Sequence, residues 1–310
     1  MPTWRRAFRE KIKHNWRWLF ERCQRLGFDI LPRHFYSSIP DFRELRRNSK
    51  WKEPLSMFGI NGAEPESQLA WARECCPPEL VERMVRARVY DHACRENGGE
   101  GYGHVEADFL FCFICSKRPR RIVQIGAGVS TATILLALRQ TGHLAEVVCI
   151  DPFPTGYLET VAARGVIRLL PIAAQDVELA VLTSLEAGDM LFVDSTHTVK
   201  VGGEVNRIIL EVLPRLRQGT YVHFHDVYFP YDYPEELMNL LFFQSEHSLL
   251  YAFLLQNNHY TIRASLSMLH HLKTAELKAL LPTYCPAQMD HGLLTSAAGH
   301  FPDSIYLQVI

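Results

Sequence analysis

The stretch Arg121–Thr131, with the sequence RIVQIGAGVST, constrains the fold more than any other part of the chain. An apolar run ends at Gly126, a Gly-Ala-Gly turn follows, and Ser130 and Thr131 precede an apolar segment of helix-forming residues. This order predicts a strand, a tight turn and a capped helix. Glycines let the backbone approach a ligand closely, and a helix N-terminus presents free N–H groups. The unit is therefore either a nucleotide-type binding turn or a turn that only closes a βα unit.

The chain after residue 121 alternates between predicted strands and helical segments. Strands are predicted at Arg121–Ile125, Glu146–Ile150, Val166–Leu170, Asp189–Val193, Thr220–His225, Tyr260–Ala264 and Ile305–Val309. Such alternation favours an α/β fold of the Rossmann-like, doubly wound type, with a mostly parallel seven-stranded sheet and helices on both faces. Ligands of such sheets bind at the carboxyl ends of the strands.

The part of the chain before the sheet has a different character. We predict an N-terminal helical cap or lid over residues 1–100, which could also serve oligomerisation, and a Rossmann-like domain over residues 101–310. Residues 1–26 have helical spacing, with basic residues between tryptophans. This favours a helix that packs on the domain or on a second subunit, and peripheral contact with an anionic membrane is the alternative. The loop Gly98–Glu106 is either a linker between cap and core or a segment that closes over bound cofactor.

Composition excludes several classes of protein. The net charge of −1 gives no reason to expect a nucleic-acid partner. No apolar run is long enough for a transmembrane segment, and the basic start lacks the apolar core of a signal peptide, so we expect a cytoplasmic protein. The eight cysteines have no secreted-scaffold spacing, which predicts reduced thiols. Cys112 and Cys115 form a C-x-x-C inside an apolar segment, which is more typical of a buried helix face than of a metal site. We also expect a homo-oligomer.

Polar residues follow several of the predicted strands. The second strand ends at Asp151, whose carboxylate could accept hydrogen bonds from both hydroxyls of a ribose, or could cap a turn. The fourth ends at Asp194, with His197 three residues on, and the fifth ends at His225 and Asp226. Because the carboxyl ends of parallel strands share one edge, these groups should converge near the glycine turn. In a later helix, residues 246 and 247 (Glu-His) either reach this edge or lie at the surface.

Residues 121–226 resemble a class I S-adenosylmethionine-dependent methyltransferase. The matching segments are VQIGAGVST, VVCIDPFP, GDMLFVDSTHTVK and GTYVHFHDVYFPYDYP. The DSTH and HxHD pair is most similar to a bacterial subgroup of small-molecule and sugar-type methyltransferases, and distantly to catechol O-methyltransferase. The segments ILPRHFYSSIPD and SEHSLLYAFLLQNN look like parts of the same subgroup, so the resemblance covers nearly the whole chain.

The resemblance implies a cofactor, S-adenosylmethionine, and a set of contacts to it. Gly126 and Gly128 would line its methionine part and ribose, and Asp151 would hold the ribose hydroxyls. The other cofactor contacts implied are Gln124, Ser130, Pro152, Phe153, Gln175 and Asp194. Gln124 departs from the family, which more often has an acid there that helps to bind the amino group of the cofactor.

Methyl transfer from a sulfonium needs an acceptor in line with the C–S bond and often the removal of a proton. In catechol-type enzymes the matching positions bind a divalent cation. Here Asp194, His225 and Asp226 would be the ligands, and the histidine leaves Mg, Mn, Fe and Zn open. Alternatively, His225 or His197 acts as a metal-free base. The predicted catalytic residues are therefore His225, Asp226 and His197. The acceptor would be a small molecule or sugar, methylated preferably on oxygen.

Two other functions remain as alternatives at this stage. The first is another nucleotide-cofactor enzyme, such as an NAD-dependent dehydrogenase or a hydroxylase-like relative. Dinucleotide-binding turns read G-x-G-x-x-G, whereas Thr131 stands at the third glycine position, which favours the methyltransferase. The second is a non-catalytic cofactor-binding module, which only Gln124 supports.

Overall fold

The computed structural model describes residues 16–31, 33, 37–233, 243–287 and 299–310. Two compact units divide the chain between Arg47 and Asn48. In the first unit, residues 16–25 are helical and α2 spans Phe42–Arg47. The part of the predicted N-terminal helix before residue 16 lies outside the described residues. No helix in the described part of the chain is long and apolar enough to cross a membrane.

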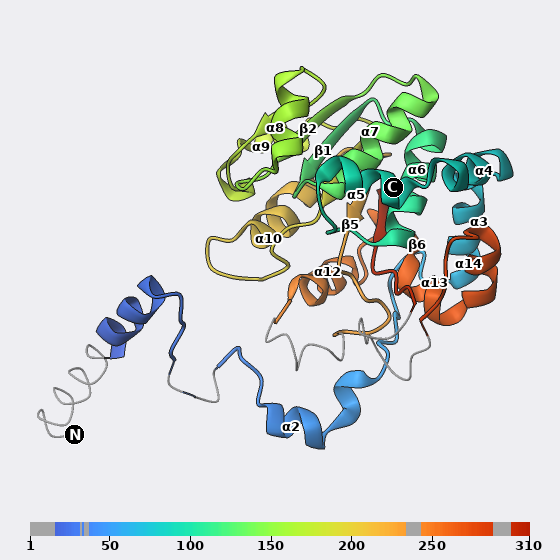
Figure 1. Ribbon diagram of the computed structural model, residues 1–310. Coiled ribbons are helices and arrows are strands. Elements are labelled where there is room, and N and C mark those ends of the chain that lie inside the picture. Colours follow the sequence, from blue (N-terminus) through green and yellow to red (C-terminus); the bar gives the residue numbers. More distant parts are fainter. Residues whose placement is uncertain (1–15, 32, 34–36, 234–242, 288–298) are drawn as a thin grey trace, which may run out of the picture. The chain divides into compact units, whose positions relative to one another are not determined.

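The second unit is built on one seven-stranded sheet (Figure 1). Its strands are β1 (Arg121–Ile125), β2 (Glu146–Ile150), β3 (Arg168–Leu170), β4 (Met190–Val193), β5 (Tyr221–Phe224), β6 (Tyr260–Ser265) and β7 (Ile305–Val309). Their order across the sheet is β3-β2-β1-β4-β5-β7-β6. The neighbours from β3 to β5 are parallel, and β7 runs antiparallel between β5 and β6. The predicted mostly parallel, doubly wound sheet is confirmed.

Helices cover both faces of the sheet because each central strand is apolar on both sides. One core contains side chains of α3 (Pro65–Cys75), α4 (Pro78–Ala87), α5 (Val89–Asn97), α6 (His104–Lys117), α7 (Val129–Thr141), α8 (Gly156–Ala163), α13 (Leu266–Leu272) and α14 (Thr274–Leu280). The other contains side chains of α9 (Leu179–Thr183), α10 (Glu204–Arg207) with its continuation η3 (Ile208–Val212) and η4 (Leu213–Arg215), and α12 (Glu246–Leu254). In β1, Ile122 belongs to the first core and Val123 to the second, as the two-residue period of a strand requires.

Helices α3 to α6, in and beside the segment expected to form a cap, pack within the second unit. Helices α5 and α6 contact α7, and α3 contacts β6. All eleven residues from Val105 to Cys115 of α6 are buried, and a helix that is apolar all round must lie in an interior. The compact units therefore meet between Arg47 and Asn48 rather than near residue 100. Cys112 and Cys115 are buried and free, as predicted for a helix face.

Candidate functional site

The two glycines of the turn after β1 serve different purposes. Gly126 has a φ of 77°, and a Cβ there would lie 1.7 Å from the carbonyl oxygen of Asp194. Glycine is therefore required for the turn to pass the end of β4. At Gly128 a Cβ would meet no atom nearer than the Asn97 side chain at 3.7 Å, which is an ordinary contact. The packing of the protein itself therefore demands a glycine at Gly126 but not at Gly128.

Gln124 lies behind this turn and is fully buried. Its Nε2 donates to Ser130 Oγ at 2.7 Å, and Thr131 Oγ1 donates to its Oε1 at 2.8 Å. The glutamine therefore joins β1 to the first turn of α7, and neither it nor Ser130 reaches the pocket wall. The structure makes Gln124 a residue that positions the glycine turn, which gives the departure from the family a physical reason.

Asp151 links the ends of β1 and β2. Its Oδ2 accepts from the backbone N–H of Ala127 at 3.1 Å, and its Oδ1 accepts from that of Phe153 at 2.8 Å. The side chain of Phe153 beside it is 88% exposed. One carboxylate thus fixes the glycine turn and the following loop, next to an aromatic ring that is free to stack on a ligand.

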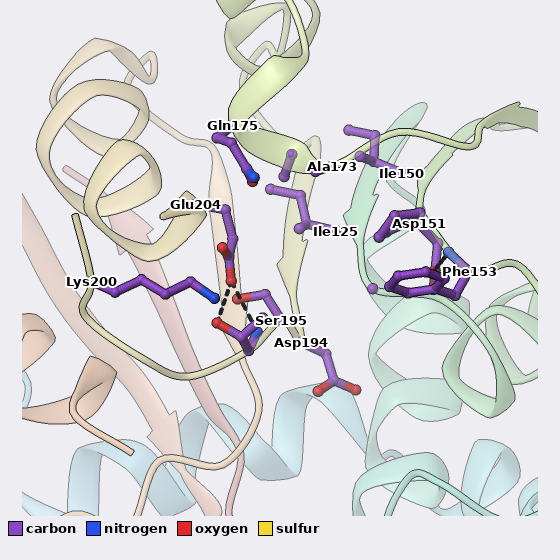
Figure 2. Close-up of a pocket in the computed structure, with 14 residues that line it drawn as sticks. Ile125, Ile150, Asp151, Phe153, Ala173, Gln175, Asp194, Ser195, Lys200 and Glu204 are labelled. Carbon is purple, nitrogen blue, oxygen red and sulfur yellow. Dashed lines mark hydrogen bonds between the residues drawn. The ribbon is translucent and has the colours of Figure 1, made fainter. Parts of the chain in front are cut away.

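A pocket of about 320 Å³ opens at the carboxyl ends of β1, β2 and β4. This is where the strand order reverses, the usual place for a ligand in an open α/β sheet. Six of the implied cofactor residues line it: Gly126, Asp151, Pro152, Phe153, Gln175 and Asp194. Figure 2 shows Asp151 and Phe153 on one side and Lys200 and Glu204 on the other.

Glu204, a residue of the pocket wall that the sequence did not single out, holds the loop after β4. Glu204 Oε1 accepts from the N–H of Thr196 at 3.1 Å and from its hydroxyl at 2.6 Å. Because Thr196 lies between Asp194 and His197, these bonds fix the segment that carries both polar groups. Local spacing gave no signal for Glu204, which lies on the next helix.

Asp194, His197 and Asp226 gather at the ends of β4 and β5. Nε2 of His197 lies 2.9 Å from Asp226 Oδ2 and 3.4 Å from Asp194 Oδ1. One ligand atom from each of the three lies within 4.8 Å of the others, which could hold a metal ion. His197 and Asp226 both have a φ of 55°, a left-handed conformation that is uncommon outside glycine. We call these three residues the first cluster.

The opposite nitrogen of His197 is held by Glu246, at the start of α12. Nδ1 lies 2.8 Å from Glu246 Oε2, and Glu246 is 1% exposed. The backbone N–H groups of Ser245 and Glu246 donate to the carbonyl of His197 at 2.8 and 3.1 Å. The start of α12 thus fixes both the backbone and the ring of His197. Glu246 therefore lies in the site rather than at the surface.

His225 faces two groups of carboxylates. Its Nδ1 lies 3.5 Å from Asp194 Oδ1 and 3.7 Å from Asp226 Oδ2, so the metal set implied by the resemblance is brought together. Its Nε2 lies 3.1 Å from Asp303 Oδ1, and Glu106 completes a second group with one ligand atom of each within 4.8 Å. We call Glu106, His225 and Asp303 the second cluster. The sequence did not indicate Glu106 or Asp303.

The aspartates and the histidines of the site have pKa values shifted in opposite directions. Burial opposes the ionisation of Asp194 and Asp226, but the histidines His225 and His197 hold the pKa of Asp194 well below its usual range and that of Asp226 at about 2. Burial also opposes a charge on His197 and on His225, yet the surrounding carboxylates raise the pKa of both rings well above the ordinary value. His223, by contrast, is buried beside Tyr102 and Phe192, and burial lowers its pKa.

Fold and site together place a pocket at the carboxyl edge of the sheet, beside a centre of acids and histidines. Residues 123–227 match the model of a family described as a methyltransferase domain. This segment, about a third of the chain, is accordingly similar to methyltransferase domains. The segment matched contains the glycine turn, Asp151, Asp194 and Asp226.

Comparisons with individual proteins give low sequence identities. An uncharacterized protein of Archaeoglobus fulgidus is 28% identical over 172 residues, which cover 50% of this chain and 73% of that protein. A methyltransferase of Podospora anserina, solved with bound SAH, is 16% identical, with 91% of this chain and 99% of that chain covered and a TM-score of 0.39. An O-methyltransferase of Bacillus cereus, solved in complex with SAH, is 13% identical, with 75% of this chain and 91% of that chain covered and a TM-score of 0.41.

Proposed function

We propose that this protein moves the methyl group of S-adenosylmethionine to an oxygen of a small-molecule or glycan-precursor acceptor, assisted by a divalent cation in the first cluster. The observation that carries the proposal is the placement of His197. Glu246 holds one ring nitrogen, and the other nitrogen faces the carboxylates of Asp194 and Asp226.

The first cluster fits a cation in its chemistry as well as its geometry. Histidines that bind metals usually donate their other N–H to a carboxylate, which sets the tautomer and the ring orientation. Glu246 supplies that carboxylate. Because one ligand is an imidazole, two aspartates and a histidine suit Mn²⁺, Fe²⁺ or Zn²⁺, whereas a site with oxygen ligands alone would suit Mg²⁺ or Ca²⁺. Such an ion, when bound, lowers the pKa of an acceptor hydroxyl and gathers its oxygens.

Asp194 connects the cofactor to the acceptor. It lines the pocket, its backbone carbonyl lies against Gly126, and its carboxylate belongs to the first cluster. An acceptor oxygen near that carboxylate would therefore lie beside a cofactor bound against the glycine turn. Placing donor and acceptor side by side is the larger part of what methyl transfer requires from a protein.

A metal-free mechanism would use His197 as the general base, oriented by Glu246. The carboxylates around His197 raise its pKa well above the ordinary value, even though burial opposes its charge. The same carboxylates can stabilise either a proton on His197 or a cation between them. The geometry favours the cation, because Glu246 holds one ring nitrogen and the other faces two carboxylates.

The proposal is tested by measuring the production of S-adenosylhomocysteine with a panel of catechol, hydroxyl and sugar acceptors. We expect EDTA to reduce turnover by about 10²-fold or more and added Mn²⁺ to restore it, while calorimetry shows S-adenosylhomocysteine binding in both states. Full turnover in EDTA would contradict the cation and leave His197 as the base. A lack of cofactor binding at millimolar ligand would contradict the cofactor site itself.

A further inference from the structure

We propose that the second cluster, Glu106, His225 and Asp303, binds a second divalent transition-metal ion beside the first. The three residues come from α6, the end of β5 and the segment before β7, and their ligand atoms lie within 4.8 Å of one another. The first ion is the one in the proposed function. The second site does not depend on it, because its ligands Glu106, His225 and Asp303 are separate from those of the first cluster.

Asp303 and Glu106 are held in place by the backbone. The N–H of Asp303 donates to Glu106 Oε1 at 2.8 Å, and the carbonyl of Asp303 accepts from the N–H of Val227 at 2.7 Å. These bonds join the first turn of α6 to the loop after β5. The two carboxylates are therefore positioned by the fold before any ligand binds.

His225 supplies an observation that points to a ligand. The residue is only 8% exposed, and both of its ring nitrogens are buried without a hydrogen-bond partner. Nε2 nevertheless lies 3.1 Å from Asp303 Oδ1, so the two atoms are close without the geometry of a hydrogen bond. Buried polar atoms are nearly always satisfied, and a buried nitrogen without a hydrogen bond is commonly explained by a water or an ion at the site.

The charge of the two clusters supports the same conclusion. Five carboxylates surround the two imidazoles: Asp194, Asp226, Glu246, Asp303 and Glu106. In the part of the chain that the structure describes, no lysine or arginine forms a salt bridge with any of them. The two adjacent carboxylates of the second cluster, Glu106 and Asp303, therefore share a single imidazole, and a cation between them would add positive charge where the two acids lie together.

The surroundings shield the second cluster and select its ion. A Cβ at Gly103, the N-cap residue of α6, would lie 1.9 Å from Glu106 Oε2, so a glycine at this position leaves room for the carboxylate. The ring of Tyr102 lies 4.8 Å from that of His225 between centroids. One imidazole and two carboxylates in a shielded site favour Mn²⁺, Fe²⁺ or Zn²⁺ over Ca²⁺.

Equilibrium dialysis of the full-length protein against Mn²⁺, followed by elemental analysis, tests the inference. We expect two ions per chain in the wild type and one in Glu106→Gln and in Asp303→Asn. Asp226→Asn should also retain one ion, in the second cluster. The matched control is Asp108→Asn, which removes another buried acid of α6 that lies outside both clusters and should leave two ions bound.

The outcomes separate the second site from the first. One ion in the wild type, unchanged in Glu106→Gln and lost in Asp226→Asn, would overturn the second site and leave the proposed function standing. No bound ion in the wild type would overturn both sites. If Glu106→Gln does not fold, Asp303→Asn and the number of ions in the wild type still decide between one site and two.

Discussion

The cofactor side and the cluster side of the sheet edge satisfy their polar groups in opposite ways. Near the glycine turn, Gln124 is bonded to two hydroxyls and Asp151 to two backbone N–H groups. At the ends of β4 and β5, the buried charges face mainly one another, and the nitrogens of His225 have no hydrogen bonds. The polar groups of the first side are satisfied within the protein, whereas the second side is where we propose a cation.

Backbone conformation shows the same contrast. Among the non-glycine residues with positive φ are His197 and Asp226, both of the first cluster. Holding such residues in a left-handed conformation costs about 1–3 kcal/mol each, and it persists only where the surroundings enforce it. On the cofactor side the positive φ falls on Gly126, where it costs little. Backbone strain is therefore present in the first cluster without being confined to it, since Met57, Arg88, Arg118 and Gln256 also have positive φ.

The largest expected effect is on kcat, when a residue of the cluster side is replaced and the cofactor side is left unchanged. Asp226→Asn removes a ligand of the proposed cation and should lower kcat by about 10³-fold, equivalent to about 4 kcal/mol. Its affinity for S-adenosylhomocysteine should stay near that of the wild type, because Asp226 does not line the pocket. Steady-state kinetics and calorimetry measure the two quantities.

Asp151→Ala is the reciprocal variant. It removes two charge-assisted bonds that hold the glycine turn, and it should weaken cofactor affinity by about 10–100-fold. Mn²⁺ binding should be unchanged in Asp151→Ala. If Asp226→Asn weakened cofactor binding as much as Asp151→Ala does, the two sides would not be separate sites.

A smaller effect tests whether Gln124 supports the turn or the cofactor. Gln124→Leu leaves the hydroxyls of Ser130 and Thr131 without partners in a buried place, and should reduce the free energy of unfolding by about 2 kcal/mol. Gln124→Glu keeps an acceptor for both hydroxyls, so it should recover much of this loss. Urea unfolding measures both variants. Cofactor affinity that fell in Gln124→Leu without loss of stability would contradict the positioning role.

The sequence predicted the fold further than it predicted the site. The bounds of β1, β2 and β7 were predicted correctly, because short apolar runs are bounded by polar or glycine residues. The boundary near residue 100 differs from the observed division, because only packing shows that α5 and α6 belong with α7. The strand-end residues were found because parallel strands share an edge. Glu106 and Asp303 lie far apart in the sequence, and only the folded chain brings them there; for Glu246 it decides between this edge and the surface.

The smallest expected effect concerns a buried acid outside both clusters. Asp108 is 2% exposed, and burial raises its pKa to about 7. The hydroxyl of Thr283 donates a hydrogen bond to the carboxylate, which partly offsets this rise in pKa. Because the folded pKa is above the unfolded value of 3.8, the unfolded chain loses this proton first. Stability should therefore fall as pH rises from about 4 to about 7, and change no further above that range.

Asp108→Asn removes this ionisation while an amide oxygen can still accept from Thr283. In urea unfolding with EDTA present, the variant should match the wild type near pH 4 and exceed it by about 2 kcal/mol at pH 8. Glu79→Gln, at an exposed position of α4, is the control and should show no such difference. A gain equal at both pH values would mean that shape and not charge governs this position. The pH-dependent gain would measure what ionising a buried carboxylate that has no lysine or arginine partner costs this fold, for comparison with the carboxylates that face His197 and His225.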